Sequence, residues 1–294
     1  MLAAPNPIAA TIYSELVLSL YPILIKTVNT NIFTQILARF IVFPTLALTF
    51  GSSNDFTAIW SNPYEIFVSI LHNLLNLGHV AASYVSFKNL SVGTAISLFY
   101  LYPIFNIIAA SVLFGESMSL TSIFLIAIAF IGVYLIATSH KDSDETHQNK
   151  ATHDYGVIMG ILAALSETMI FIFIRSNKNA QASPYYTVNH LYPAGLALLA
   201  LVGIYKPGIV DTSKISWAKL IGFNAFLGFT GYIARFYAIP KIPTIVFSLL
   251  AFLGVSFGYL WGVLIMGDKP TTRALFGGGL IAAATAILRY LGIV

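Results

Sequence analysis

Two acidic residues lie inside apolar segments of this sequence, in corresponding places. Glu15 is in the segment YSELVLSLYPILIK, and Glu167 is in LSETMIFIFIRSNK, 152 positions further along. If these segments cross a membrane, each carboxylate costs on the order of 2.5 to 3.5 kcal/mol, and residues of this kind usually face a cavity and mark a pathway through the protein. Two acids that share a buried site are also suited to exchange protons near neutral pH.

Two arginines in other apolar segments are candidate partners of these acids. The guanidinium group of Arg39 is a planar fork of donors that can bind a carboxylate or a phosphate, or can neutralise Glu15. Arg235, in the second half of the chain, is another base that the glutamates could reach. A structural alternative therefore stays open, in which the glutamates pair with these bases or lie near a membrane boundary. We favour a functional role for the two glutamates over that alternative.

A further set of polar residues lies within one apolar segment. Their spacing of four, three and four residues places them on one face of a helix. They are His72, Asn76, His79 and Ser83, and the positions 152 residues later are Asn224, Gly228, Gly231 and Arg235. Such a polar face either lines a cavity or bonds to neighbouring helices, and both interpretations stay open. His79, nearer the middle of the segment, either relays protons or is a bonded interior histidine.

One more histidine and two aromatic residues complete the candidates. His190 allows the same two interpretations as His79, and Tyr100 and Tyr259 either stack on a flat or cationic ligand or serve packing. We find no catalytic motif or metal-ligand spacing beside them, so the sequence predicts no enzyme, no metal site and no cofactor. The residues predicted to bind substrate or to couple its movement are Glu15, Arg39, Asn76, His79, Tyr100, Glu167, His190, Arg235 and Tyr259.

The composition requires a membrane around the segments that carry these residues. Of the 294 residues, 57% are hydrophobic and only 9% are charged, and the mean hydropathy is +0.82. Apolar stretches of about 20 residues, the length that crosses about 30 Å of hydrocarbon, occur ten times between short polar breaks. They run near Ile8 to Val28, Asn31 to Phe50, Ile66 to Phe87, Gly93 to Phe114, Leu120 to Thr138, Tyr155 to Ile174, Tyr185 to Ile204, Lys219 to Ile239, Thr244 to Met266 and Ala274 to Leu291.

The offset of 152 residues recurs at sparse positions along the whole chain. Ser14-Glu15 returns as Ser166-Glu167, and Gly115-Glu116 returns as Gly267-Asp268. Because five crossings are an odd number, the second copy must enter from the opposite side of the membrane. The sequence therefore predicts an all-α membrane protein of ten transmembrane helices arranged as a 5+5 inverted repeat. Its predicted parts are a first repeat over residues 1–139, a linker over 140–154 and a second repeat over 155–294.

The linker HKDSDETHQNKATHD has almost no apolar residues and is predicted to be solvated. Its three histidines lack cysteine partners and a regular ligand spacing, so we expect no metal there. The N-terminus has no basic region of the kind that precedes a cleavable signal, and we expect the first helix to remain.

The end of each half carries a family resemblance. The stretch FYLYPIFNIIAASVLFGESMSLTSIFLIAIAFIGVYLI has Pro103, the Gly115-Glu116 turn and a packing glycine, Gly132. With the ten spans and the repeat, it resembles the EamA-like branch of the drug/metabolite transporter superfamily. The second copy keeps Gly267-Asp268 but departs at the positions of Pro103 and Gly132. A glutamate in the first helix also resembles the proton and substrate site of the small multidrug transporters, although the typical EamA-like protein has no acid there.

These features favour a secondary transporter that moves a small organic solute, such as an amino acid, a metabolite or a cationic compound, by alternating access. Proton-coupled export is one form that such transport can take. The alternative within transport is an exchanger of organophosphates or nucleotide sugars, which would need several bases around phosphate. The alternative outside transport is a membrane scaffold or enzyme. We expect the solute, protons and the lipid bilayer as partners and no nucleic acid, and a monomer could suffice although a dimer is possible. The bacterial inner membrane or a plasma membrane is the expected location.

Overall fold

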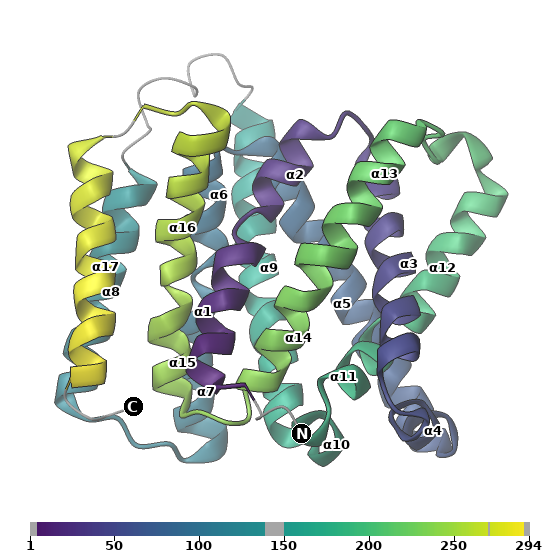
Figure 1. Ribbon diagram of the computed structural model, residues 1–294, viewed down its shortest axis with the longest axis horizontal. Coiled ribbons are helices and arrows are strands. Elements are labelled where there is room, and N and C mark those ends of the chain that lie inside the picture. Colours follow the sequence, from purple (N-terminus) through teal and green to yellow (C-terminus); the bar gives the residue numbers. More distant parts are fainter. Residues whose placement is uncertain (1–4, 139–149, 270, 291–294) are drawn as a thin grey trace.

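The computed structural model describes residues 5–138, 150–269 and 271–290, and these ranges fold into helices joined by short turns (Figure 1). The predicted all-α class is therefore confirmed. His140 and His147 of the predicted linker lie outside the described residues. The first half contains α1 (Pro7–Leu18), α2 (Tyr21–Thr27), α3 (Ile32–Phe50), α4 (Ser53–Trp60), α5 (Pro63–Asn89), α6 (Val92–Phe99), α7 (Tyr102–Phe114) and α8 (Leu120–Ala137).

The second half is described from Lys150 onward. Its helices include two π-helical segments and one 3-10 turn, η2. They are α9 (Lys150–Ser176), α10 (Lys178–Ala182), α11 (Pro184–Leu191), α12 (Pro193–Tyr205), η2 (Pro207–Ile209), α13 (Lys214–Phe223), η3 (Asn224–Gly228), α14 (Phe229–Ala238), α15 (Thr244–Ala251), α16 (Leu253–Trp261), η4 (Gly262–Met266) and α17 (Thr272–Tyr290).

Consecutive helices join into ten crossings, as predicted. Seven are long and apolar enough to span a membrane, and α8 and α17 are shorter apolar helices. The remaining crossing, α13 through α14, carries Lys214, Lys219 and Arg235. In Figure 1, α1 rises from the end of the molecule where α9 finishes, and α17 finishes at that same end. The two halves therefore run in opposite directions, as an inverted repeat requires.

The 152-residue offset also relates the ends of the helices. Val92 and Thr244 begin α6 and α15, and Leu120 and Thr272 begin α8 and α17. Before each of the last pair, the chain turns through a glycine in the left-handed region. Gly115 has φ 65° and Gly267 has φ 77°, a conformation that only glycine adopts without strain.

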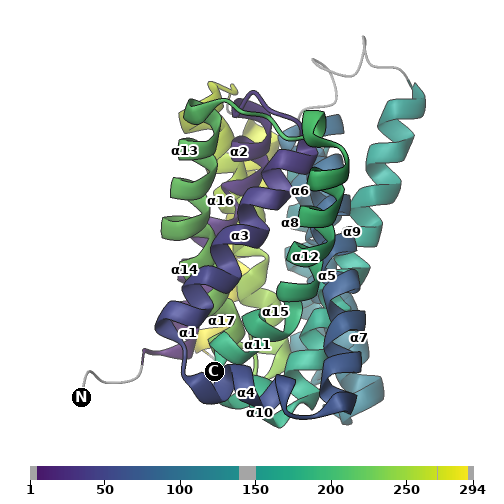
Figure 2. The ribbon, with the colours of Figure 1, turned by 90° about the vertical axis from the view of Figure 1, so that its right-hand side faces the viewer.

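Two details depart from the sequence interpretation. α9 begins at Lys150, so the last residues assigned to the linker are helical. The short helix α4, capped by Ser52 and Asp55, follows α3 and lies near α10 and α11 (Figure 2). At the equivalent position in the sequence, the second half has only the turn η2.

Breaks within the crossings shape the interior. α1 ends before Pro22, α6 ends before Pro103, and α11 ends before Pro193, because proline lacks the N–H that would continue the helix. A π-helical turn, η3, interrupts the crossing that carries Arg235. Such interruptions turn side chains out of regular helical order and frequently occur at functional sites.

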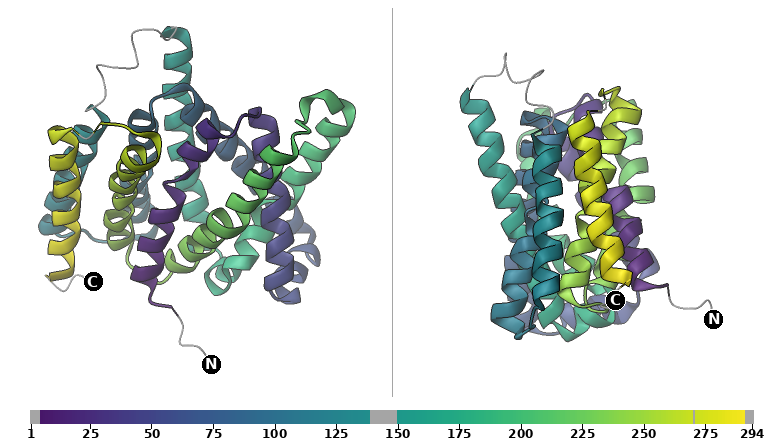
Figure 3. Two further views of the ribbon diagram at one scale, coloured as in Figure 1. Left: turned by 45° about the horizontal axis from the view of Figure 1, so that its top comes forward. Right: turned by 90° about the vertical axis from the view of Figure 1, so that its left-hand side faces the viewer.

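The pair α8 and α17 packs at one edge of the molecule, where both helices run side by side (Figure 3). A Cβ atom on Gly132 would lie 2.5 Å from the Gly277 carbonyl oxygen, and one on Gly277 would lie 2.6 Å from the Gly132 carbonyl oxygen. The glycines therefore allow close contact of the two backbones, as is usual between membrane helices. The polar residues described below come from the other helices.

Candidate functional site: a buried cluster of acids and arginines

Arg235 joins the two predicted glutamates at the centre of the molecule. Its Nη2 donates to Glu15 Oε1 and its Nη1 donates to Glu167 Oε1, both at 2.7 Å. All three side chains are at most 5% exposed. Glu15 comes from α1, Glu167 from α9 and Arg235 from α14, so one guanidinium links three helices and both halves. Glu15 is neutralised by Arg235 and not by Arg39, which was the other open pairing.

Glu15 is held further by two tyrosine hydroxyls. Tyr100 donates to Oε2 at 2.7 Å and Tyr102 donates to Oε1 at 3.3 Å. On a continuous α-helix, two side chains that are two residues apart would point in directions about 200° apart around the axis. The break between α6 and α7 falls between these tyrosines, so both rings can face the same carboxylate.

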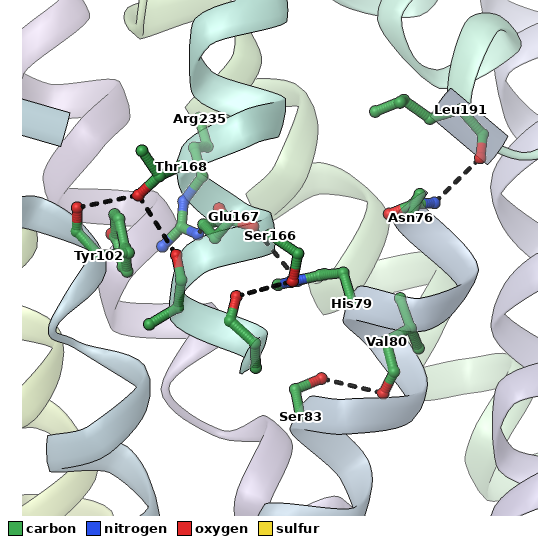
Figure 4. Close-up of polar contacts among 12 residues, drawn as sticks. Asn76, His79, Val80, Ser83, Tyr102, Ser166, Glu167, Thr168, Leu191 and Arg235 are labelled. Carbon is green, nitrogen blue, oxygen red and sulfur yellow. Dashed lines mark hydrogen bonds and ion pairs between the residues drawn. The ribbon is translucent and has the colours of Figure 1, made fainter. Parts of the chain in front are cut away.

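Glu167 has a titratable neighbour instead. His79 Nε2 lies 3.2 Å from Glu167 Oε2, while Nδ1 lies 3.1 Å from the Ala163 carbonyl oxygen (Figure 4). Nδ1 also lies 3.2 Å from the Ser166 hydroxyl oxygen. A carbonyl oxygen only accepts, so when Nδ1 bonds to Ala163 it carries the hydrogen of the ring. A neutral imidazole then has no hydrogen on Nε2, and a hydrogen bond to the carboxylate needs one additional proton. The pair formed by His79 and Glu167 is therefore a place where a proton can be bound.

Arg39 occupies a separate cage of aromatic rings. Its guanidinium carbon lies 4.4 Å from the centre of the Tyr232 ring, 5.0 Å from that of Phe43 and 5.1 Å from that of Tyr21. Nε and Nη2 both donate to the Tyr192 hydroxyl, at 3.1 and 2.8 Å. Arg39 is only 2% exposed, and no ion pair joins it to a carboxylate anywhere in the described ranges.

A small cavity lies between the two arginines. It has a volume of about 20 Å³, close to the room that one water molecule needs, so it is too small for an organic solute as it stands. The side chains of Arg39, Arg235, Ser83, Tyr84 and Tyr100 contribute to its wall. The Tyr84 hydroxyl and Arg235 Nε are buried there without a hydrogen-bond partner among the residues that the structure describes.

The cluster is asymmetric although the acids occupy equivalent positions. The residues 152 positions from His79 and Tyr102 are Gly231 and Gly254. A side chain on Gly254 would overlap the ring of Tyr100, and one on Gly231 would lie 2.6 Å from a methyl of Val17. Glycines in the second half therefore make room for the larger residues of the first half around Glu15.

Three of the predicted site residues lie elsewhere. Asn76 donates to the Leu191 carbonyl oxygen at 3.0 Å and so supports the break between α11 and α12. His190 Nε2 lies 2.9 Å from His72 Nδ1, and its ring stacks on Phe173. The Tyr259 hydroxyl accepts from the Thr271 amide at 2.7 Å. The polar face of α5 thus divides, since His79 and Ser83 face the interior while His72 and Asn76 bond to neighbouring helices.

The cage tyrosines were missed in the sequence interpretation. Tyr84, Tyr192 and Tyr232 are at most 5% exposed and surround Arg39, but we had assigned no role to them. A signal was present, because tyrosines in the middle of spans differ from the tyrosines that mark membrane interfaces. An arginine in such a span needs donors or rings around it, which should have directed attention to these tyrosines.

A further ion pair, between Glu116 and Arg175, connects the two halves at one end of the molecule. Glu116 pairs with Arg175 at the end of α9 and accepts from the Thr244 amide at 3.1 Å, at the start of α15. Arg175 also donates to the Ile239 and Ile242 carbonyl oxygens, at 2.9 and 3.0 Å. Gly115-Glu116 thus connects the two halves at this end. In the part of the chain that the structure describes, no group of three or more potential ligands could hold a metal ion.

Ten membrane crossings in two inverted halves, with charged residues buried between them, define the protein as a membrane transporter of the two-repeat class. The sequence profile of the EamA-like transporter family matches residues 7–138 and again 154–290. The chain therefore belongs to the EamA-like transporter family.

Individual relatives agree with this assignment. A protein of Archaeoglobus fulgidus named "Uncharacterized transporter" is 24% identical over 73% of this chain and 73% of its own length. The Bacillus subtilis "Uncharacterized transporter YxxF" is 24% identical over 69% of this chain and 63% of its own length. A crystal structure that is 14% identical covers 97% of both chains with a TM-score of 0.71, which shows that the fold is shared.

Proposed function

We propose that this protein is a secondary transporter that moves a small organic solute by alternating access and exchanges it for protons at the central cluster. The observation that carries the proposal is the double pairing of Arg235 with Glu15 and Glu167. These three residues link α1, α9 and α14, which belong to different halves. A change in the charge of one carboxylate changes how strongly those helices hold together, so proton or solute binding can be coupled to movement.

The proton site is the contact between His79 and Glu167. An added proton there compensates the negative charge of Glu167, so Glu167 attracts Arg235 less strongly. Glu15 is then the stronger partner of Arg235. Arg235 then ties α14 to α1 more strongly than to α9. When a solute binds and the proton leaves, Arg235 is again attracted by both acids. Solute and proton therefore compete, as an exchanger requires.

The contacts between the two halves around Glu116 support alternating access. The central cavity holds about one water, and the pairing of Glu116 with Arg175 connects α9, α15 and the end of α7 on one side of it. We infer that this arrangement is an occluded state, which opens toward one side of the membrane or the other as the halves move. The alternative of a phosphate exchanger is less well supported, because one of the two central arginines already has two carboxylate partners.

The location and assembly follow from the same proposal. We infer a bacterial inner membrane or a plasma membrane, with the lipid bilayer around the apolar helix faces. One chain supplies both acids and Arg235, so a monomer suffices for the proposed mechanism.

The test is solute and proton flux in liposomes that contain the purified protein and an interior pH dye. The panel comprises amino acids, polyamines, nucleobases, carboxylates and aromatic cations. We expect at least one solute to cause a pH change in the wild type, and expect the change to disappear in the double variant Glu15→Gln, Glu167→Gln. Asp154→Asn, an exposed carboxylate in the first turns of α9, is the matched control and should behave as the wild type.

Two results would count against the proposal. Solute movement at equal rates in the wild type and the double variant, without a pH change, would mean that the glutamates are structural. If no solute moves in the wild type, transport of these compounds is excluded and a scaffold becomes the better explanation.

A further inference from the structure

We propose that Arg39 binds a carboxylate group of the solute, so that the substrates of this protein are organic acids or zwitterions with one carboxylate. The inference rests on the proposed function, because it assigns a subsite next to the same central cluster. It concerns a different arginine from the one that holds the two glutamates.

The first support is the charge of Arg39. A guanidinium that is 2% exposed, inside a membrane-spanning helix, carries a large desolvation cost unless a negative group accompanies it. Arg235 meets this requirement with two carboxylates at 2.7 Å. Arg39 has aromatic rings and the Tyr192 hydroxyl around it, and within the described ranges no carboxylate pairs with it.

The second support is that Arg39 has N–H donors left for a ligand. Arg39 donates through Nε and Nη2, and both hydrogen bonds end on the same Tyr192 hydroxyl. The guanidinium has five N–H groups, and these two bonds use only part of them, so donors are left for a ligand. A carboxylate can accept two parallel hydrogen bonds from such a fork, which makes it the best-matched ligand.

The third support is the cavity itself. Arg39 lines it together with Tyr84, whose hydroxyl lies near Arg39 and Tyr21 without completing a hydrogen bond. Arg235 Nε is likewise buried there without a partner in the described residues. Both groups are buried on residues that line the cavity, and an acceptor group of a ligand that enters between the two arginines could satisfy them.

The glutamates do not supply the missing negative charge. Glu15 accepts hydrogen bonds at both oxygens from Arg235, Tyr100 and Tyr102. Glu167 accepts from Arg235 at Oε1, and its Oε2 lies 3.2 Å from His79 Nε2 without a hydrogen bond in the described residues. Two guanidiniums and two carboxylates therefore balance overall, but the positive charge of Arg39 and the negative charges lie in different places. A zwitterion, with its carboxylate at Arg39 and its amine on the side of Glu15, would match this distribution, and the carboxylate of a simple organic acid would match the positive charge of Arg39 alone.

The experiment compares acids with their neutral amides by equilibrium dialysis of the detergent-purified, full-length protein. The probes are propionate, benzoate, alanine and leucine, each against its carboxamide. We expect at least one acid to bind, and expect its amide to bind at least about 30-fold more weakly, the size expected when one partner of a buried charged hydrogen bond is removed. Arg39→Gln should abolish the difference between acid and amide, and Arg39→Lys should keep part of it.

A second variant protects the test against misfolding. Tyr84→Phe removes one hydroxyl and leaves Arg39 in place, so it should weaken acid binding several-fold and leave amide binding unchanged. Tyr186→Phe, which removes a hydroxyl that bonds to Glu65 at 3.2 Å far from the cavity, is the matched control and should have no effect.

The outcomes separate this inference from the proposed function. If acids and amides bind equally, or if no acid binds selectively, the inference is wrong, even if solutes still exchange for protons in liposomes. If acids bind selectively through Arg39 but no solute moves, the inference stands and the proposed transport mechanism is wrong.

Discussion

Glu15 and Glu167 occupy the same position in the two halves, share one arginine, and yet have different surroundings. Glu15 receives hydrogen bonds from the hydroxyls of Tyr100 and Tyr102, which stay protonated at ordinary pH. Glu167 faces His79, whose imidazole can bind one more proton. The repeat therefore supplies symmetric positions with unequal partners, and in our proposal Glu15 holds Arg235 while the pair of Glu167 and His79 binds the proton.

The largest effect should follow from removal of the shared arginine. Arg235→Met leaves two buried carboxylates without their base, and we expect the free energy of unfolding to fall by about 3–5 kcal/mol. Unfolding in detergent, followed by circular dichroism, measures it. Adding Glu15→Gln should restore more stability than adding Glu167→Gln, since Glu167 still has His79. Equal rescue by the two changes would contradict the difference that we draw between the acids.

Filling the space beside Glu15 should have the next largest effect. Gly254→Ala places a methyl group into the ring of Tyr100, and overpacking of this kind costs about 1–3 kcal/mol. We expect lower thermal stability and slower solute exchange. Gly278→Ala is the control, because its Cβ would lie 3.7 Å from the nearest side-chain atom, an ordinary contact. If Gly254→Ala matched that control, Tyr100 would not be confined as described.

The proton site can be tested through the pH dependence of transport. Protonated His79 competes with Arg235 for Glu167, so we expect wild-type exchange to be about ten-fold faster at pH 6 than at pH 8. His79→Gln keeps a polar side chain but cannot titrate, and its rate should be nearly independent of pH. His72→Gln, which alters the pair formed with His190, should keep the wild-type profile. A profile that persists in His79→Gln would place the titrating group elsewhere.

The smallest effect should come from the hydroxyl beside Glu15. Tyr100→Phe removes one hydrogen bond of 2.7 Å to a carboxylate, and we expect a loss of about 1.5 kcal/mol of stability, at the low end for a bond to a charged group because Glu15 keeps Arg235 and Tyr102. The pH dependence of transport should remain, because the proton site is not touched. Tyr13→Phe, at an exposed hydroxyl that bonds to Thr230, gives the reference value for the loss of a phenol group. A flattened pH profile in Tyr100→Phe would show that both acids titrate together.

Much of the architecture was predictable because it depends on local chemistry. Apolar segment lengths identified the ten crossings, and the repeated Gly115 and Gly267 identified equivalent turns, since both positions need a left-handed conformation. The division of the chain at residues 139 and 155 stays a prediction. Helix starts were less accurate, as at Lys150, because polar residues can extend a helix beyond the membrane.

The chemistry was predictable only in part. Glu15, Glu167 and Arg235 could be singled out, since charges in apolar segments are costly. That Arg235 and not Arg39 joins the acids could not be foreseen, because it depends on how α14 and α1 pack. The cage around Arg39 also depends on packing between helices. The functional roles of all these residues stay proposals until the variants are measured.

Tyr192 connects the anion subsite to the shape of the fold. It is the C-cap of α11 and the N-cap of α12, and its hydroxyl accepts both hydrogen bonds that orient Arg39. The break on which it lies is fastened to α5 by Asn73, which accepts from the Gly195 amide at 3.2 Å, and by Asn76. A change in the angle between α11 and α12 would move the Tyr192 hydroxyl and, with it, the guanidinium of Arg39. The bend in this crossing thus sets the position of the positive charge that we propose meets the solute.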